Sequence, residues 1–237
     1  VRDFLLSNAF FWLDEFHVDG FRLDDVDAML YLDFGREAGH WTPNLYGSNE
    51  NLQALEFIKH LNSIVKKYNP GVIMIAQEDG LWPQLTDSVE NDHPGFDYKW
   101  SGGWTRDFLT YMETEPMRRN EHYDQMTLSM MYAYSEHYVL TLGKRDVGTT
   151  AEFLEKLPGS LKQKVAQLRA AYGYLTLHPG IKMTAPDFDI TPELKEYIHD
   201  LNEFYKTNPA LYLMDGNSDG FEWIRFTNYD ENIVAFL

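Results

Sequence analysis

Short apolar segments alternate with amphipathic helices along most of this chain, and this alternation restricts its fold more than any other feature. The segment 72–76 is a continuous apolar run between turn signals, the pattern of a strand buried on both faces. The spacing of apolar residues predicts strands at 21–24, 72–76, 95–100 and 138–142, and helices at 2–16, 51–67, 103–112, 161–177 and 192–206. Strands that alternate with helices indicate a parallel sheet, so the sequence predicts an α/β fold.

The end of the chain follows a different pattern. Residues 222–226 and 233–237 are β-patterned, and residues 228–232 between them have the composition of a turn. We expect these segments to form the first hairpin of a separate β-domain. The predicted division is therefore an α/β domain over 1–212 and the start of a β-domain over 213–237.

Composition limits the partners that the chain can take. The formal net charge of −17 disfavours nucleic acid and anionic membranes as partners. No stretch approaches the ~18 uninterrupted apolar residues of a membrane span. The chain has no cysteine, which excludes disulfides, thiolate metal sites and a cysteine nucleophile and agrees with a cytoplasmic location. Since the chain begins with Val1 inside a helical pattern, we expect it to be part of a longer protein.

The first candidate for chemistry lies at the end of a predicted strand. In a parallel barrel, active sites lie at the carboxyl ends of the strands, and Asp24 falls at such an end. Arg22 comes two residues earlier and so shares a strand face with Asp24. An arginine that orients an ionised carboxylate is what a glycosyl nucleophile needs, although a surface ion pair would have the same spacing.

The next strand also ends in polar residues, Gln77, Glu78 and Asp79. A retaining glycosidase needs a second carboxyl group ~5–5.5 Å from the first. Glu78 and Asp79 supply carboxylates, but Glu78 alternates in direction with Gln77. The eight histidines are scattered without metal-ligand spacing, so no metal site is expected.

Aromatic residues are frequent in the predicted loops. Because sugars present apolar C–H faces, such rings are candidates for stacking on a glucan, and core packing is the alternative for each of them. The candidates are Trp41, Tyr46, Trp82, Trp100 and Trp104.

Several motifs carry a resemblance to a known family. Residues 20–24 (Gly-Phe-Arg-Leu-Asp) are similar to the segment around the nucleophile in the α-amylase superfamily. More specific segments resemble bacterial glycogen branching enzymes, and these are 29–33, 44–47, 49–52, 82–83, 95–100, 103–104, 128–136, 157–159, 172–174 and 208–224. The resemblance covers nearly the whole chain.

The resemblance implies the C-terminal part of a (β/α)8 TIM-type barrel, about strands 4 to 8, followed by the start of an all-β domain. It also implies a glycosyltransferase of glycogen biosynthesis, which cleaves an α-1,4-glucan with retention and rejoins the piece as an α-1,6 branch without a cofactor. On this basis Asp24 is the expected nucleophile and Arg22 the residue that orients it.

Three places depart from the family pattern. One is the segment 183–189, where the family has a Gly-Glu-Phe-Gly region, and the other two are single catalytic positions. Gln77 stands where the family has its general acid, and an amide cannot donate a proton as a carboxylic acid does. Glu78 matches the second glutamate of that motif and is a possible substitute. Arg145 stands where the family has the aspartate that faces the cationic transition state.

These departures leave three hypotheses open. The chain is a partial catalytic domain with degenerate motifs, a catalytically inactive glucan-binding module, or a remnant of a branching enzyme. An α-glucan is the expected partner in the first two cases. A partial barrel exposes strand edges, so a homodimer formed through those edges is a further expectation.

Overall fold

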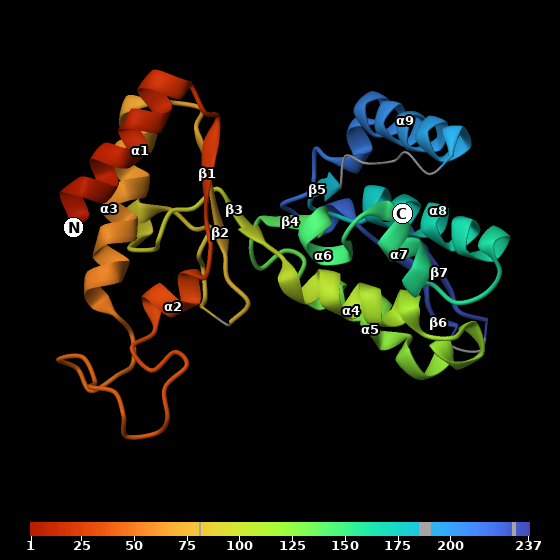
Figure 1. The fold of residues 1–237 in the computed structure, drawn as a ribbon, viewed down its shortest axis with the longest axis horizontal. Coiled ribbons are helices and arrows are strands. Elements are labelled where there is room, and N and C mark those ends of the chain that lie inside the picture. Colours follow the sequence, from red (N-terminus) through yellow and green to blue (C-terminus); the bar gives the residue numbers. More distant parts are fainter. Residues whose placement is uncertain (81, 185–190, 229–230) are drawn as a thin grey trace. The chain divides into compact units, whose positions relative to one another are not determined.

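The computed structural model describes residues 1–80, 82–184, 191–228 and 231–237. The chain forms two compact units, Val1–Trp100 and Ser101–Leu237 (Figure 1). The boundary predicted near residue 212 concerns a different division, between an α/β part and a β-domain, and stays a prediction. No helix in the described part of the chain is long and apolar enough to cross a membrane.

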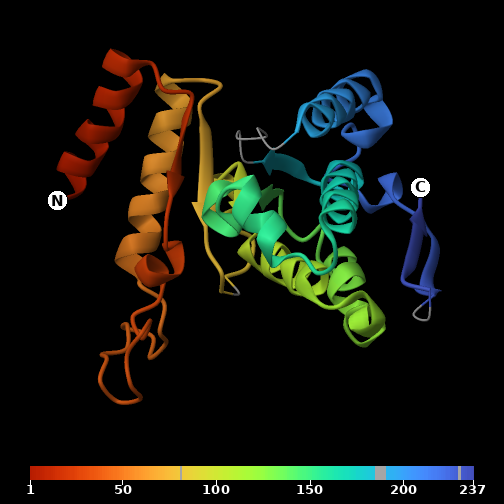
Figure 2. The same cartoon turned by 45° about the vertical axis from the view of Figure 1, so that its right-hand side comes forward.

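The first unit places two long helices beside three short parallel strands. Its elements are α1 (Arg2–Phe16), β1 (Gly20–Leu23), α2 (Val26–Leu30), α3 (Leu52–Tyr68), β2 (Ile73–Gln77), η1 (Val89–Asn91) and β3 (Tyr98–Trp100). β2 pairs in parallel with β1 and with β3. Figures 1 and 2 show α1 and α3 on the same side of β1 and β2. Leu13, Ile58, Val65, Met74 and Ala76 belong to the core between these layers.

The prediction that β2 is buried on both faces is wrong. Met74 and Ala76 are fully buried, whereas Ile73 is 41% exposed and Ile75 is half-buried. Successive side chains of a strand point to opposite faces, so only the face that carries Met74 and Ala76 packs on the helices. The other face carries Ile75 and Gln77 and is open to the candidate site described below.

The second unit combines two parallel strands, several helices and an antiparallel hairpin. Its elements are α4 (Gly102–Glu113), η2 (Pro116–His122), α5 (Asp124–Thr127), η3 (Leu128–Met131), β4 (Tyr138–Leu142), α6 (Lys144–Val147), α7 (Thr150–Lys156), α8 (Leu161–Leu177), β5 (Ile181–Thr184), α9 (Pro192–Thr207), η4 (Pro209–Leu211), η5 (Ser218–Gly220), β6 (Trp223–Asn228) and β7 (Ile233–Phe236). β4 and β5 are parallel, and β6 and β7 are antiparallel.

The terminal hairpin packs on the α/β part of the same unit. The Tyr123 hydroxyl donates a hydrogen bond to the carbonyl oxygen of Ile233 at 2.7 Å, and the ring of Phe236 meets that of Tyr174 edge-on. Phe108, Phe153 and Tyr172 belong to the core of this unit. The hairpin predicted for the end of the chain is thus present over the described residues.

Side-chain caps explain where several helices begin. Asn51 accepts a hydrogen bond from the Ala54 amide at the start of α3, and Ser101 accepts one from the Trp104 amide at the start of α4. Ser160 and Gln163 form a reciprocal capping box at the start of α8. Each cap satisfies amide groups that the first turn of a helix leaves without a partner.

The close approach of β1 to β2 requires a glycine at position 20. A Cβ at Gly20 would lie 2.2 Å from the carbonyl oxygen of Ile73, its partner on β2. We therefore expect Gly20→Ala to lower the free energy of unfolding by ~1–3 kcal/mol, the usual cost of overpacking. The matched control is Gly103→Ala, because a Cβ at Gly103 in α4 meets no atom within 4 Å. Equal stability of the two variants in urea denaturation would contradict this prediction.

Candidate active site

The carboxyl ends of β1, β2 and β3 bring three of the predicted catalytic residues together, Arg22, Asp24 and Gln77. Leu23 pairs with Ala76, and Gln77 pairs with Trp100, so the residue after Leu23 is a neighbour of Gln77. That residue is Asp24, whose Oδ1 accepts a hydrogen bond from Arg22 Nε at 2.7 Å. Because Arg22 and Asp24 lie two positions apart at the end of a strand, this contact forms without any change of backbone direction.

Arg22 is held from two sides. Its guanidinium lies over the ring of Trp100, 4.4 Å from the ring centroid, while its Nε contacts Asp24. The side chains of Arg22 and Asp24 are 21% and 42% exposed, so the pair is open to solvent on one side. The charge-assisted hydrogen bond and the cation–π contact together fix the position of the guanidinium. Its hydrogen bond to Asp24 in turn limits the orientations of that carboxylate.

Gln77 supports the turn that follows Asp24. Its Oε1 accepts a hydrogen bond from the Asp25 amide at 2.8 Å. Asp25 has a φ of 52° and precedes the first residue of α2, so the chain turns sharply at this point. The side chain of Gln77 therefore lies beside the predicted nucleophile. In this position the amide can accept and donate hydrogen bonds, but it cannot act as a general acid.

Glu78 lies on the opposite face of the strand, as its alternation with Gln77 predicts. It is 1% exposed, and its Oε2 forms an ion pair with Lys99 Nζ at 2.5 Å. The Trp82 amide approaches the other carboxylate oxygen at 3.5 Å. Burial raises the pKa of the Tyr31 hydroxyl, and the negative charge of Glu78 raises it further. The role of Glu78 as a substitute acid stays a prediction.

Lys99 is a residue that the sequence interpretation missed. Its partner on β2 is Ala76, so it faces the same side of the sheet as Glu78. The available signal was the alternation within β3. A lysine at the centre of this three-residue strand must point away from the face that carries Trp100.

The aromatic residues chosen from the sequence fall into four environments. Trp100 is half-buried beside Arg22 on the open face. Trp41 and Tyr46 lie in the loop between α2 and α3, where Tyr46 is 78% exposed. The side chain of Asn44 holds that loop by accepting a hydrogen bond from the Tyr46 amide at 2.9 Å. Trp82 is half-buried, with its ring edge-on to Tyr31.

Trp104 belongs to the core of the second unit. It is 2% exposed and stacks on Phe108 with the ring centroids 5.0 Å apart. The sequence analysis named Trp104 as a candidate for stacking on a sugar, whereas in this structure its ring packs in the core.

Arg145 also belongs to the second unit. It is an exposed residue of α6, directly after β4. The neighbouring Asp146 accepts a hydrogen bond from the Gly143 amide at 2.8 Å, which closes the turn between β4 and α6. The predicted role of this position in transition-state chemistry stays a prediction. Within the described residues, no group of three or more His, Asp or Glu side chains could hold a metal ion.

Comparison with known proteins identifies relatives of the whole chain. It is 40% identical over 260 residues to a 1,4-α-glucan branching enzyme of Clostridium perfringens, a match that covers 100% of this chain and 39% of the relative. Branching enzymes of Shewanella frigidimarina and Thermobifida fusca are also 40% identical, with 35% of each covered. The chain thus spans roughly two fifths of the length of these relatives. No protein-family model matches the chain.

Solved structures with low sequence identity share its fold. An α-amylase of Anoxybacillus superposes with a TM-score of 0.56 at 16% identity, covering 94% of this chain and 46% of the amylase. A pullulanase of Bacillus acidopullulyticus superposes with a TM-score of 0.61 at 11% identity, covering 99% of this chain and 32% of the pullulanase. With the parallel strands and the small antiparallel sheet, these likenesses confirm the expected fold, part of a (β/α)8 barrel followed by β-structure.

The buried ion pair below the site gives a testable stability prediction. Glu78→Gln leaves the charge of Lys99 buried without a carboxylate, so we expect a loss of about 3 kcal/mol in the free energy of unfolding. The double variant Glu78→Gln/Lys99→Met should recover most of that loss, because it buries no charge. As a control, Glu203→Gln breaks an exposed pair with Lys206 and should cost less than about 1 kcal/mol. A double variant no more stable than Glu78→Gln in urea denaturation would contradict this account.

Proposed function

Because this chain belongs to the 1,4-α-glucan branching enzyme family, we propose that it binds an α-1,4-glucan at the carboxyl ends of β1, β2 and β3. The observation that carries this proposal is the cluster of Arg22, Asp24, Gln77 and Trp100 on one open face. It combines an oriented carboxylate with an aromatic ring, the two features that a glucan site requires.

In this proposal Asp24 is the nucleophile and Arg22 is its positioning residue. The Asp24 carboxylate attacks the anomeric carbon of a glucosyl unit and forms a covalent glycosyl intermediate, while the bond to the leaving 4-oxygen breaks. That oxygen needs a proton. The amide of Gln77 supplies none, so the step loses an acid catalyst whose usual contribution is ~10²–10⁴-fold.

The whole reaction of the family is the transfer of the cleaved piece to a 6-hydroxyl group as an α-1,6 branch. We propose that this chain carries out that transfer far more slowly than a full-length relative. Two substitutions support this, the missing acid at Gln77 and the positive charge of Arg145 at the position that we assign to the transition-state carboxylate. The alternative is that the chain binds glucan but has no catalytic activity. The glutamine at position 77 favours this alternative too, because it cannot donate the proton that the reaction needs.

Binding of a linear maltooligosaccharide tests the glucan site. We expect calorimetric titration of the chain with maltoheptaose to show binding, and Trp100→Ala to weaken it about tenfold, which corresponds to ~1.4 kcal/mol. The reason is that Trp100 supplies a ring on the open face and supports Arg22. Trp12→Ala is the matched control, because Trp12 lies on α1 in contact with Phe11 and Phe16. Equal affinity of both variants and the parent would contradict the proposed site.

A branching assay tests the chemistry separately. We expect an iodine-stain assay on amylose to show little formation of α-1,6 linkages by the parent chain. Gln77→Glu alone should restore little activity, because Arg145 remains. Asp24→Asn in the Gln77→Glu background is the control for any residual rate, since it removes the proposed nucleophile. Strong branching by the parent chain, or full recovery in Gln77→Glu, would show that these substitutions do not limit the reaction.

A further inference from the structure

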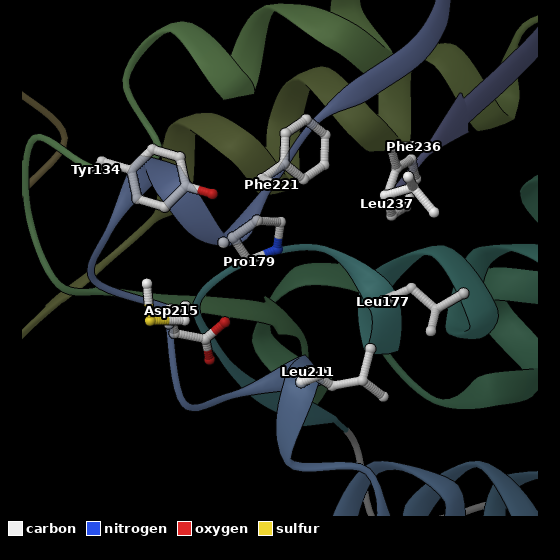
Figure 3. A pocket seen from close by; sticks show the side chains of 11 residues that line it. Tyr134, Leu177, Pro179, Leu211, Asp215, Phe221, Phe236 and Leu237 are labelled. Carbon is white, nitrogen blue, oxygen red and sulfur yellow. The ribbon is translucent and has the colours of Figure 1, made fainter.

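A hollow lies in the second unit, where the terminal hairpin meets the ends of α8 and η4. Its volume is about 270 Å³. Its walls are mostly apolar, and aromatic rings line part of them (Figure 3). The lining residues include Tyr134, Leu177, Pro179, Leu211, Asp215 and Phe221. A space of this size suits a small molecule or a single unit of a larger one.

Aromatic contacts stiffen the wall of this pocket. The ring of Phe221 stacks on that of Phe236, with centroids 5.1 Å apart and planes inclined by 28°. Trp223 meets both rings edge-on. The rings are therefore held by one another, and their position does not depend on an occupant.

One carboxylate, that of Asp215, interrupts the apolar wall. Figure 3 shows it on the same side of the pocket as the Tyr134 hydroxyl. Lys182 Nζ lies 3.6 Å from Asp215 Oδ2, and the side chains are 11% and 20% exposed respectively. Lys182 Nζ also donates a hydrogen bond to the Tyr205 hydroxyl at 3.4 Å. The polar wall is thus a built network.

The charge of this network is balanced within the protein. Burial lowers the pKa of Lys182 to about 8 and raises the pKa of Asp215, and each charge partly opposes the effect of burial on the other. A cationic ligand would compete with Lys182 for the carboxylate, and an anionic ligand would meet Asp215 directly. The polar wall therefore favours a neutral ligand whose hydroxyl groups donate hydrogen bonds to carboxylate oxygens.

From this arrangement we propose that the pocket binds a neutral pyranose ring, a glucosyl unit of an α-glucan chain. The apolar C–H faces of the sugar pack against Phe221, Pro179 and Leu211, and its hydroxyl groups donate hydrogen bonds to Asp215 and meet the Tyr134 hydroxyl. The choice of glucose as the sugar rests on the proposed function, whereas the preference for a neutral polyol rests on the pocket. This site is distinct from the Asp24 cluster and belongs to the other compact unit.

The test is a methyl NMR titration of the full chain, labelled at leucine methyl groups, with maltose. Leu177 and Leu211 report on the pocket, and Leu23 reports on the Asp24 cluster. We expect the Leu177 and Leu211 signals to shift in a saturable way. Glucosamine and glucose 6-phosphate, which carry opposite charges on the same ring, should bind at least threefold more weakly at this site.

Two variants probe the pocket in different ways. Asp215→Asn removes the carboxylate and should weaken the response of Leu177 and Leu211 at least tenfold. Because this change leaves Lys182 buried without its partner, Ala210→Trp serves as a second variant that fills the rim of the pocket and leaves the network intact. It should abolish the shifts. Asp200→Asn on α9 and Tyr197→Phe, whose hydroxyl contacts Arg169, are the matched controls and should behave as the parent.

The possible outcomes separate this proposal from the proposed function. Shifts at Leu23 without shifts at Leu177 and Leu211 would overturn the pocket proposal and leave the glucan site at Asp24 standing. Shifts at Leu177 and Leu211 alone would support the pocket and contradict the Asp24 site. Stronger binding of either charged sugar than of maltose would overturn the neutral-ligand assignment. No shift at any of the three would overturn both.

Discussion

The register of three parallel strands is the constraint on which the first unit depends. Gly20 pairs with Ile73, and Gln77 pairs with Trp100, so side chains far apart in sequence reach the same face at the same height. In a strand a shift of one residue sends every side chain to the opposite face. Such a shift in β2 would remove Gln77 from Asp24 and place a buried carboxylate there instead. The backbone of Ile73 lies so close to position 20 that only a glycine fits there, and this ties the register to that residue.

This register separates the proposed site from the buried interior within a single strand. Gln77 faces the open side with Arg22 and Trp100, while Glu78 faces the interior and pairs with Lys99. Two neighbouring residues of similar size thus serve different purposes. Loss of either partner would leave a buried charge, so the two residues fit the interior only as a pair. Glu78 is therefore in a poor position to reach a substrate on the open face.

Much of this arrangement was predictable from the sequence, because it depends on local periodicity. The spacing of two between Arg22 and Asp24 predicts a shared face, and the alternation of Gln77 and Glu78 predicts opposite faces. The long helices were predictable for the same reason. The short helices α2, α5, α6 and α7 were not predicted, because a few residues carry no readable period. The exposure of Ile73 and the burial of Trp104 depend on packing between segments, which no local pattern specifies. Likewise, the pocket around Asp215 is formed by segments from Tyr134 to Leu237.

In our proposal Gln77 replaces the general acid of the family, and its position shows why such a change spares the fold. Its structural role is to accept one hydrogen bond from the Asp25 amide. A glutamate and a glutamine both carry an oxygen that can do this, and the two side chains have nearly the same shape. The turn after Asp24 can therefore form with either residue, and exchanging one for the other should change the free energy of unfolding little. The chemistry does distinguish them, because only the carboxylic acid can release a proton to a leaving oxygen. In our proposal this substitution removes one catalytic function and leaves Arg22 and Trp100 in place on the open face, where a glucan would bind.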